Sequence, residues 1–418
     1  MSATAQFTTG SFPIAWVREQ FPALRLSVGR QPAVFLDGPG GTQVPESVIR
    51  AVCNYYRTSN SNLGGQFLTS QKTSEIVQQA RKALAEFFNA SDAAEIIFGQ
   101  NMTSLTFALS RVLAKNWKPG AEVIVTSLDH DANISPWRLA AEKKNVVVKT
   151  WHFRKETCSL NVEDLRSLIS DRTELIAVTL ASNAVGSLVD VRSVVELAKK
   201  VGAMVFVDAV HFAPHAKIDV QALGCDFLAC SAYKFFGPHI GVLWARGEWL
   251  ASTENFKVRP ASNQPPGKWE TGTQSFEGIA GTLAALEYLQ EVANQSIGAK
   301  SPLAVMDVIR QYELKISKRF LSGIAQNSRI TIYGIADPAL AAGRTPTFAV
   351  RLRGLHPDAA AKKLGEQGIF VWSGHFYALD LIEGLRLSDQ GGVIRIGFVH
   401  YNTAEEVDRT LDALENLR

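Results

Sequence analysis

The chain has 418 residues, of which 46% are hydrophobic and 20% are charged. Its 43 lysines and arginines against 40 aspartates and glutamates leave a formal net charge of +3, which gives no electrostatic reason to expect a nucleic-acid partner. This length and composition exclude a disordered chain and predict two or three domains with a large buried core.

The sequence shows no membrane or export signal. No run approaches the roughly 18 consecutive apolar residues of a transmembrane helix, and the segment Met1 to Gly10 lacks a basic region followed by an apolar one. The four cysteines form no CxxC pair, so neither a disulfide framework nor a zinc site is indicated. We therefore expect a soluble cytoplasmic protein of the size of an enzyme, with no membrane partner.

The middle of the chain alternates apolar, β-branched runs with amphipathic stretches, which is typical of an α/β domain with a mostly parallel sheet. The stretches Thr103–Lys115 and Val191–Val201 are expected to be helices. The expected strands are Glu95–Phe98, Glu122–Ser127, Val146–Trp151, Leu175–Leu180, Met204–Asp208, Phe227–Ala229 and Gly241–Ala245.

The pattern changes at Arg259–Gly267, which is rich in proline, glycine and asparagine. Two helical stretches follow, and the last hundred or so residues are expected to form a smaller α+β domain. The predicted helices are Gly278–Val292, Leu303–Gln326, Asp358–Gln367 and one beginning near Thr403, and the predicted strands are Thr347–Leu352, Ile369–Trp372 and Val393–Gly397. We expect an N-terminal segment over 1–34 that packs against the small domain, a large domain over 35–290 and a small domain over 291–418.

Polar side chains follow several of the expected strands, where ligands bind in parallel α/β sheets. A helix start suited to a phosphate follows the first strand, and an imidazole, an amide, a carboxylate and a lysine follow others. The segments are Gly99–Ser104, Asp129–Asn133, Ser182–Asn183, Asp208 with His211, and Ser231–Lys234. Pyridoxal 5′-phosphate (PLP) requires such a set: a lysine for the Schiff base, a carboxylate for the pyridine nitrogen and groups that hold the phosphate.

Two further patterns could suggest a metal ion or a nucleotide, but neither is complete. His211 and His215 are four residues apart, but Pro214 lies between them and no HExxH helix contains them, so we expect no metal site. The glycine-rich Gly38–Gly41 lacks both GxGxxG and a P-loop lysine, and is expected to form a turn at the mouth of the active site.

The chain resembles the class V aminotransferase-fold PLP enzymes, and most closely their cysteine desulfurase-like branch. Val205–Val210, Ser231–Lys234 and Glu270–Gln274 carry the resemblance most specifically, and it extends from Phe35 to Asp408. It implies the fold type I architecture, in which a large domain with a mostly parallel seven-stranded sheet binds PLP and a smaller α+β domain follows. It also implies a homodimer.

The resemblance implies a role for each matching residue. Lys234 would form the Schiff base and shuttle protons, Asp208 would pair with the pyridine nitrogen, and His130 would stack on the ring and could also move protons in catalysis. Arg395 would bind the substrate α-carboxylate. The remaining cofactor contacts would come from Asn183 and His211 at the ring hydroxyl, from Met102, Thr103, Ser231 and Tyr233 at the phosphate, and from Thr273 of the neighbouring subunit.

The sequence departs from the desulfurases in the loop that carries their persulfide-forming cysteine. Tyr377 stands in the place of that cysteine, and Trp372 replaces an arginine of the same loop. A phenol cannot form a persulfide, so sulfur relay through this position is not expected. Tyr377 could act as a catalytic acid, line the pocket or only pack.

We therefore expect a PLP-dependent enzyme that acts on an amino acid through an external aldimine and α-proton removal. The favoured reaction is that of a cysteine desulfurase-like C–S lyase, or another β-lyase, without the persulfide-forming cysteine. An aminotransferase or a racemase or epimerase of the same fold is the alternative. A catalytically silent PLP-binding partner protein is the alternative from another class.

Overall fold

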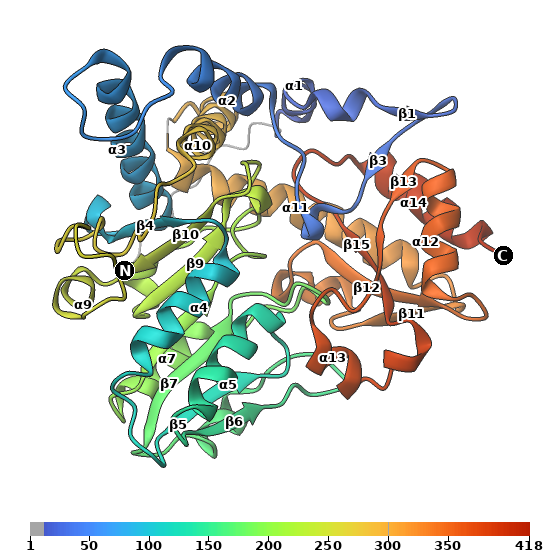
Figure 1. Cartoon of the computed structure of the whole chain (residues 1–418). Helices are drawn as coiled ribbons and strands as arrows, with labels where there is room; N and C mark the ends of the chain where they lie inside the picture. Colours follow the sequence, from blue (N-terminus) through green and yellow to red (C-terminus); the bar gives the residue numbers. More distant parts are fainter. Residues whose placement is uncertain (1–11, 300) are drawn as a thin grey trace, which may run out of the picture.

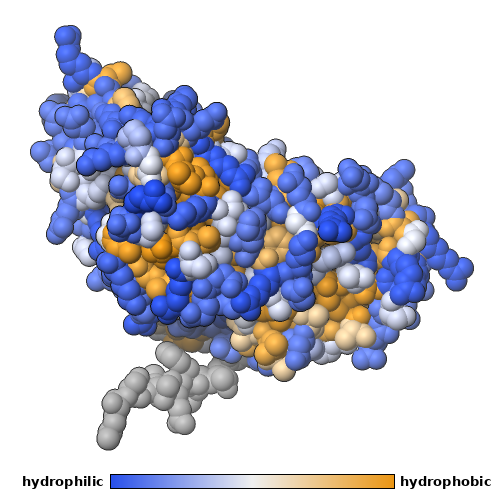
Figure 2. Space-filling view, turned by 90° about the horizontal axis from the view of Figure 1, so that it is seen from below, coloured by the Kyte–Doolittle hydropathy of each residue, from blue (hydrophilic) through white to orange (hydrophobic). Residues whose placement is uncertain are grey.

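The computed structural model describes residues 12–299 and 301–418. A larger lobe contains a seven-stranded sheet, and a smaller lobe beside it contains a four-stranded sheet (Figure 1). No helix of the described residues is long and apolar enough to cross a bilayer. Hydrophilic side chains cover much of the face in Figure 2, and hydrophobic ones gather in separate patches.

The large sheet confirms the predicted α/β class. Its strand order is β4-β10-β9-β8-β7-β5-β6, and only β10 runs antiparallel to its neighbours. The strands are β4 (Ile96–Gly99), β5 (Glu122–Thr126), β6 (Val147–Trp151), β7 (Thr173–Thr179), β8 (Met204–Asp208), β9 (Phe227–Ser231) and β10 (Gly241–Ala245). Continuous apolar runs suit these strands because helices cover both faces of the sheet.

Alternate side chains along these strands pack into separate hydrophobic cores on the two faces of the sheet. Val123 and Phe206 pack with α4 (Met102–Leu113) and α5 (Ser135–Glu142) on one face. Ile124 and Val207 pack with α3 (Leu68–Phe88), α7 (Val191–Lys199) and α10 (Phe276–Ile297) on the other. This two-sided burial holds the carboxyl ends of the central strands rigidly in place.

The small lobe is built on the antiparallel sheet β11-β12-β15-β14. Its strands are β11 (Ile330–Tyr333), β12 (Thr347–Leu352), β14 (Trp372–Gly374) and β15 (Val393–Gly397), and its helices include α11 (Pro302–Ile324), α12 (Pro357–Glu366) and α14 (Ala404–Asn416). The single strand predicted over Ile369–Trp372 is wrong. Its first half is β13 (Ile369–Phe370), which pairs in parallel with β3 (Val34–Phe35), whereas β14 pairs with β15.

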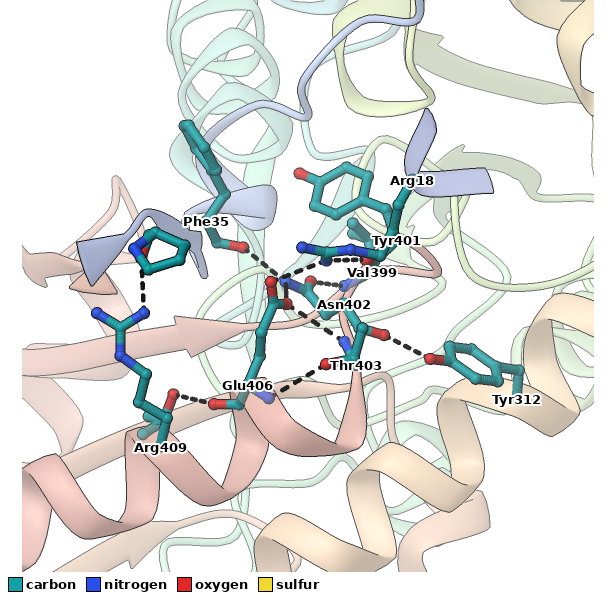
Figure 3. A network of polar contacts seen from close by, with 11 residues as sticks. Arg18, Phe35, Tyr312, Val399, Tyr401, Asn402, Thr403, Glu406 and Arg409 are labelled. Atoms are coloured by element: carbon teal, nitrogen blue, oxygen red, sulfur yellow. Dashed lines mark hydrogen bonds and ion pairs between the residues drawn. The ribbon is translucent and has the colours of Figure 1, made fainter. Parts of the chain in front are cut away.

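The start of the described chain is bound to the small lobe by a polar network (Figure 3). Arg18 of α1 (Ile14–Glu19) donates from Nη1 to the Tyr401 carbonyl and to Glu406, both at 2.8 Å. Asn402 donates to the Phe35 carbonyl at 3.1 Å, and Glu406 also closes the capping box at the start of α14. Residues 1–11 of the predicted N-terminal segment lie outside the described residues.

The remaining elements are short connections and the helix that precedes α3. They are β1 (Ser27–Val28), β2 (Gln31–Pro32), α2 (Glu46–Thr58), α6 (Val162–Arg166), α8 (Val220–Leu223), α9 (Gly247–Ser252) and α13 (Leu379–Gly384).

Candidate active site

Lys234 lies in the short turn between β9 and β10, at the edge of the sheet where β8 also ends. Its ammonium group donates a hydrogen bond to the Pro39 carbonyl. Burial is the main cause that lowers the Lys234 pKa to about 7, and the charge of the nearby Arg395 is the second. Asp208 and Asp37 raise this pKa. A substantial fraction of this amine is therefore neutral and nucleophilic near neutral pH.

Asp208 is the last residue of β8, and its side chain is buried. The Val210 N–H donates to its Oδ1 at 2.8 Å. Burial raises the Asp208 pKa to about 6, although the Val210 N–H and Lys234 lower it. A protonated ring nitrogen placed against this carboxylate would supply the partner that burial demands.

His130 follows β5 and caps a short turn by accepting a hydrogen bond at Nδ1 from the Ala132 N–H, at 3.0 Å. Burial and the charges of Lys234 and Arg395 lower the His130 pKa to about 4, so the imidazole is neutral near neutral pH. A neutral, flat ring at this position suits stacking against another ring.

The buried Asp129 stabilises the turn that contains His130 through hydrogen bonds to residues on both sides of it. Its carboxylate accepts hydrogen bonds from Thr126 and, at 2.6 Å, from the Asn133 amide, whose oxygen accepts from Trp137 at 3.1 Å. Burial raises the Asp129 pKa to about 7. The sequence analysis named this segment but gave Asp129 no role.

Asn183 and Arg395 join the large and small lobes at the site. Arg395, buried in β15, donates from Nη1 to the Asn183 carbonyl at 3.0 Å, and its guanidinium lies 4.1 Å from the centre of the Phe376 ring. The Asn183 amide donates to the Phe376 carbonyl at 2.9 Å. The Asn183 Oδ1 and the Arg395 Nε are buried without a protein partner, so both remain free to bind a polar ligand.

His211 is buried beside these groups. Its Nε2 lies 3.1 Å from the Thr345 hydroxyl, and its ring meets the His215 ring edge-on at 5.3 Å. His215 in turn bonds Glu313 at 2.9 Å. Burial and the neighbouring His215 hold the His211 pKa well below its usual range. Across the described ranges, no three histidine, cysteine or acidic side chains gather as a metal site.

The helix start expected to hold a phosphate is formed as α4. Its Asn101 cap accepts from the Ser104 N–H at 2.8 Å, and the Met102 N–H donates to the Ser231 hydroxyl at 3.0 Å. Thr103 is exposed in the first turn. The Tyr233 ring stacks on the His239 ring at 4.7 Å. The N-terminus of a helix with hydroxyl groups beside it suits an anion.

Thr273 lies in an exposed loop rather than in the buried group around Lys234. Glu270 anchors this loop by accepting from Arg81 at 2.6 Å and from the Phe98 N–H at 2.8 Å. Beyond the anchor, Thr273 and Ser104 line an open hollow of about 1000 Å³.

Tyr377 lies next to the site with its side chain turned largely to solvent. The residue is 64% exposed, and its ring is nearly parallel to the His130 ring, with 5.3 Å between the ring centres and 20° between the planes. The Asp131 N–H donates to the Tyr377 carbonyl at 2.7 Å, which ties this loop to the His130 turn.

Several residues of the site were not singled out from the sequence: Asp37, Pro39, Thr345 and Phe376. The Asp37 Oδ1 is buried without a partner, and burial raises the Asp37 pKa to about 6, opposed by a backbone hydrogen bond and by Arg395 and Lys234. The one available signal was the Gly38–Gly41 turn, which begins directly after Asp37 and was expected at the mouth of the site.

These groups fit PLP. The buried Asp208 suits a protonated ring nitrogen, the unpaired Asn183 oxygen suits a ring substituent, and the start of α4 suits a phosphate. Lys234 has the lowered pKa that Schiff-base formation requires.

Comparison with known proteins agrees with this geometry. The family model described as aminotransferase class V matches residues 34–410. The chain belongs to this family. It is 33% identical to the "Aminotransferase-like protein FGM3" of Gibberella zeae, over 98% of this chain and 99% of the relative. It is 30% identical to a cysteine desulfurase of Yersinia pseudotuberculosis, over 97% and 98% of the two chains.

Solved structures show the same fold. A cysteine desulfurase from Thermococcus onnurineus matches with a TM-score of 0.87 and 26% identity, covering 97% of this chain and 98% of the other. A cysteine desulfurase from Escherichia coli matches with a TM-score of 0.82 and 27% identity over the same shares. This class V member is therefore a PLP-dependent enzyme of the lyase or transferase type, as the resemblance implied.

Proposed function

We propose that this class V enzyme is a cysteine desulfurase-like C–S lyase, or a related β-lyase, whose sulfur or selenium product leaves without forming a persulfide on the protein. The observation that carries the proposal is the loop residue Tyr377, which places a phenol beside His130 where a sulfur relay needs a thiol. Residues 373–378 contain no cysteine.

The four cysteines of the chain do not suit a sulfur relay. Burial raises the pKa of Cys158 to about 11 and that of Cys225 to about 12, and it also raises the pKa of the buried Cys230 well above its usual range. Cys53 is exposed but lies on α2, outside the residues that surround Lys234. A thiol with a raised pKa is a poor sulfur acceptor because the thiolate is the reactive form.

We propose the following roles for the chain's own residues. When bound, PLP supplies an electron-accepting ring that acidifies the α-proton of an amino acid. Arg395 holds the α-carboxylate with its fork of N–H donors, and the neutral Lys234 amine takes the α-proton. Asp208 would hold the proton on the ring nitrogen, and the neutral His130 would offer its ring for stacking on the cofactor.

The other predicted cofactor contacts complete this assignment. We propose that Asn183 and His211 contact the ring hydroxyl and that Met102, Thr103, Ser231 and Tyr233 bind the phosphate. Ser231 already accepts from the Met102 N–H, which leaves its own hydroxyl proton available to an anion.

The test is a panel of sulfur- and selenium-containing amino acids assayed for the carbon product. The proposal predicts pyruvate and ammonia. Alanine with transfer of sulfur to an acceptor would instead indicate desulfuration. A substrate that is racemised at Cα but keeps its composition would indicate a racemase. If no amino acid perturbs the visible spectrum of the bound cofactor, the chain is a silent PLP-binding protein and the proposal is wrong.

An aminotransferase is the second candidate, and the name of the 33% identical relative, "Aminotransferase-like protein FGM3", favours it. This reaction moves the amino group to the cofactor. Mixing the holoenzyme with one amino acid and no acceptor would then bleach the visible absorbance stoichiometrically and release the matching keto acid. Persistence of the absorbance during pyruvate release would exclude transamination.

We also propose a twofold homodimer in which Thr273 reaches the phosphate of the partner's site. The exposed Thr273 loop and the hollow beside Ser104 support this assignment, because both would be covered by a second subunit. Thr273→Ala is expected to weaken PLP binding about 10-fold without altering the sedimentation of the dimer. A monomer with full cofactor occupancy would refute the proposal.

The predicted domain division and compartment remain proposals as well. The separate sheets of the two lobes support a boundary near residue 290, although α10 continues to Ile297. All four cysteines are free, which suits a reducing, cytoplasmic compartment. Limited proteolysis and cell fractionation test these two points.

A further inference from the structure

We propose that Trp372 and Tyr377 form an aromatic wall at the mouth of the site that binds an apolar or aromatic group on the substrate's side chain. The inference rests on the proposed C–S lyase function and names its substrate class, namely cysteine S-conjugates that carry an alkyl or aryl substituent on sulfur.

Both rings are exposed where the site opens to solvent. Trp372 is 54% exposed and Tyr377 is 64% exposed. Trp372 is paired with Arg395 across the β14–β15 ladder, so the two side chains project from the same face of the small sheet. An apolar substituent of a substrate held by Arg395 could cover such rings and gain their burial.

Gly40 shows how close Trp372 lies to the carboxylate-binding position. A Cβ placed on Gly40 would meet the Trp372 Nε1 at 2.7 Å and the Arg395 Nη2 at 3.5 Å. The indole and the guanidinium therefore both lie against Gly40. The Phe376 ring covers the guanidinium at 4.1 Å, which adds a third aromatic surface.

The main chain holds the Tyr377 side of the wall in place. The Phe376 carbonyl accepts from Asn183 at 2.9 Å, and the Tyr377 carbonyl accepts from the Asp131 N–H at 2.7 Å. Both loop residues have left-handed backbones, with φ of 53° and 58°. Bulky residues seldom adopt this conformation, and two in succession are maintained here by contacts to the site.

The groups around the two rings favour an uncharged substituent over an anionic one. Tyr377 packs on His130, whose pKa is lowered to about 4 and whose ring is therefore uncharged. Arg395 is engaged by the α-carboxylate in the proposed reaction, and Lys234 by proton transfer. An anionic substituent would lose hydration against these aromatic faces without gaining a partner.

The chemistry of an S-conjugate explains why the loop needs no thiol. The α-proton is removed, the Cβ–S bond breaks with its electron pair on sulfur, and the thiolate takes up a proton and leaves as a free thiol. The remaining 2-aminoacrylate takes up water to give pyruvate and ammonium. The balanced reaction converts one S-substituted cysteine and one water into thiol, pyruvate and ammonium, with no net oxidation or reduction.

The test compares S-benzyl-L-cysteine, S-carboxymethyl-L-cysteine and L-cysteine in holoenzyme carrying Trp372→Ala or Tyr377→Ser. We expect kcat/KM for S-benzyl-L-cysteine to fall about 10-fold in each variant, mainly through KM, whereas that for L-cysteine changes less than about twofold. Trp372→Phe and Tyr377→Phe keep a ring and should stay near the wild type. Leu26→Ala, at an exposed leucine of the N-terminal segment, controls for loss of surface hydrophobicity.

A binding measurement separates this inference from the proposed function. L-homophenylalanine carries an aryl side chain but no sulfur, and its dissociation constant can be titrated through the visible spectrum of the holoenzyme, with L-alanine as reference. The wall predicts tighter binding of L-homophenylalanine, lost in Trp372→Ala and Tyr377→Ser. If this holds but no substrate yields pyruvate, the lyase proposal fails and the wall stands.

Two results would overturn the wall. One is equal loss of kcat/KM for S-benzyl-L-cysteine and L-cysteine in the alanine and serine variants. The other is L-homophenylalanine binding no more tightly than L-alanine, or equally well to all variants.

Discussion

The proposed active site has two halves that are built differently. Asp208 and Lys234 stand directly at strand ends of the large sheet, where packing on both faces leaves them little freedom. Trp372 and Tyr377 stand on a short edge strand and a loop of the small lobe, and more than half of each side chain is exposed. The contrast suggests a division of roles. The rigid half suits the cofactor, whereas substitutions in the loop half can alter substrate specificity without disturbing the cofactor site.

The largest effect is expected at the rigid half, in Lys234→Ala. Removal of the amine eliminates both the covalent attachment point and the proposed α-proton base, so kcat should fall about 1000-fold or more. Steady-state turnover with the best substrate of the panel measures this. A variant with more than a tenth of wild-type turnover would show that Lys234 is not the essential base.

Asp208→Asn tests the electrostatic part of the same half. The amide keeps the shape of the side chain but loses the charge that holds a proton on the cofactor ring, so turnover should fall about 10- to 100-fold. The affinity for PLP should fall as well, measured by titration of the apoprotein. Unchanged turnover at full occupancy would remove Asp208 from the chemistry.

Arg395→Lys tests the junction between the halves. Lysine keeps the positive charge but loses the bidentate fork, so KM should rise about 10-fold with a smaller change in kcat. The effect should be shared by every α-amino acid substrate, unlike the selective effect expected for Trp372→Ala. A loss confined to S-benzyl-L-cysteine would place Arg395 in the specificity half instead.

The smallest predicted effect is an upward shift, in Arg395→Gln, of the pH at which Lys234 is half-labelled. Only the neutral amine reacts with an electrophile, and the Lys234 pKa is lowered to about 7, so labelling of the apoprotein should rise with pH and reach half its maximum near pH 7. Arg395→Gln removes the second cause of the lowering and should move this midpoint upward. Peptide mass mapping measures the rate, and a midpoint near 10 in the wild type would contradict the burial of Lys234.

The sequence predicted the rigid half better than the loop half for a physical reason. Asp208 follows a continuous apolar strand, and strand-end positions in a parallel sheet are set by local patterns alone. The contact of Lys234 with Pro39 and the packing of Phe376 on Arg395 join segments remote in sequence. No local pattern encodes such pairings.

The edge strand shows the same limit. Ile369–Trp372 has the composition of one strand, but the chain changes partner at Val371, because β13 joins β3 and β14 joins β15. This change of partner is what brings Trp372 opposite Arg395. Asp37 was likewise missed, because its burial depends on the small lobe packing over the Gly38–Gly41 turn.

The central claim, that Lys234 binds the cofactor covalently, is tested most directly by reducing the yellow holoenzyme with borohydride and mapping its peptides by mass spectrometry. The account predicts one pyridoxyl-phosphate adduct, on Lys234, and none in Lys234→Ala. An unmodified Lys234 peptide from fully loaded protein, or an adduct on another lysine, would contradict it.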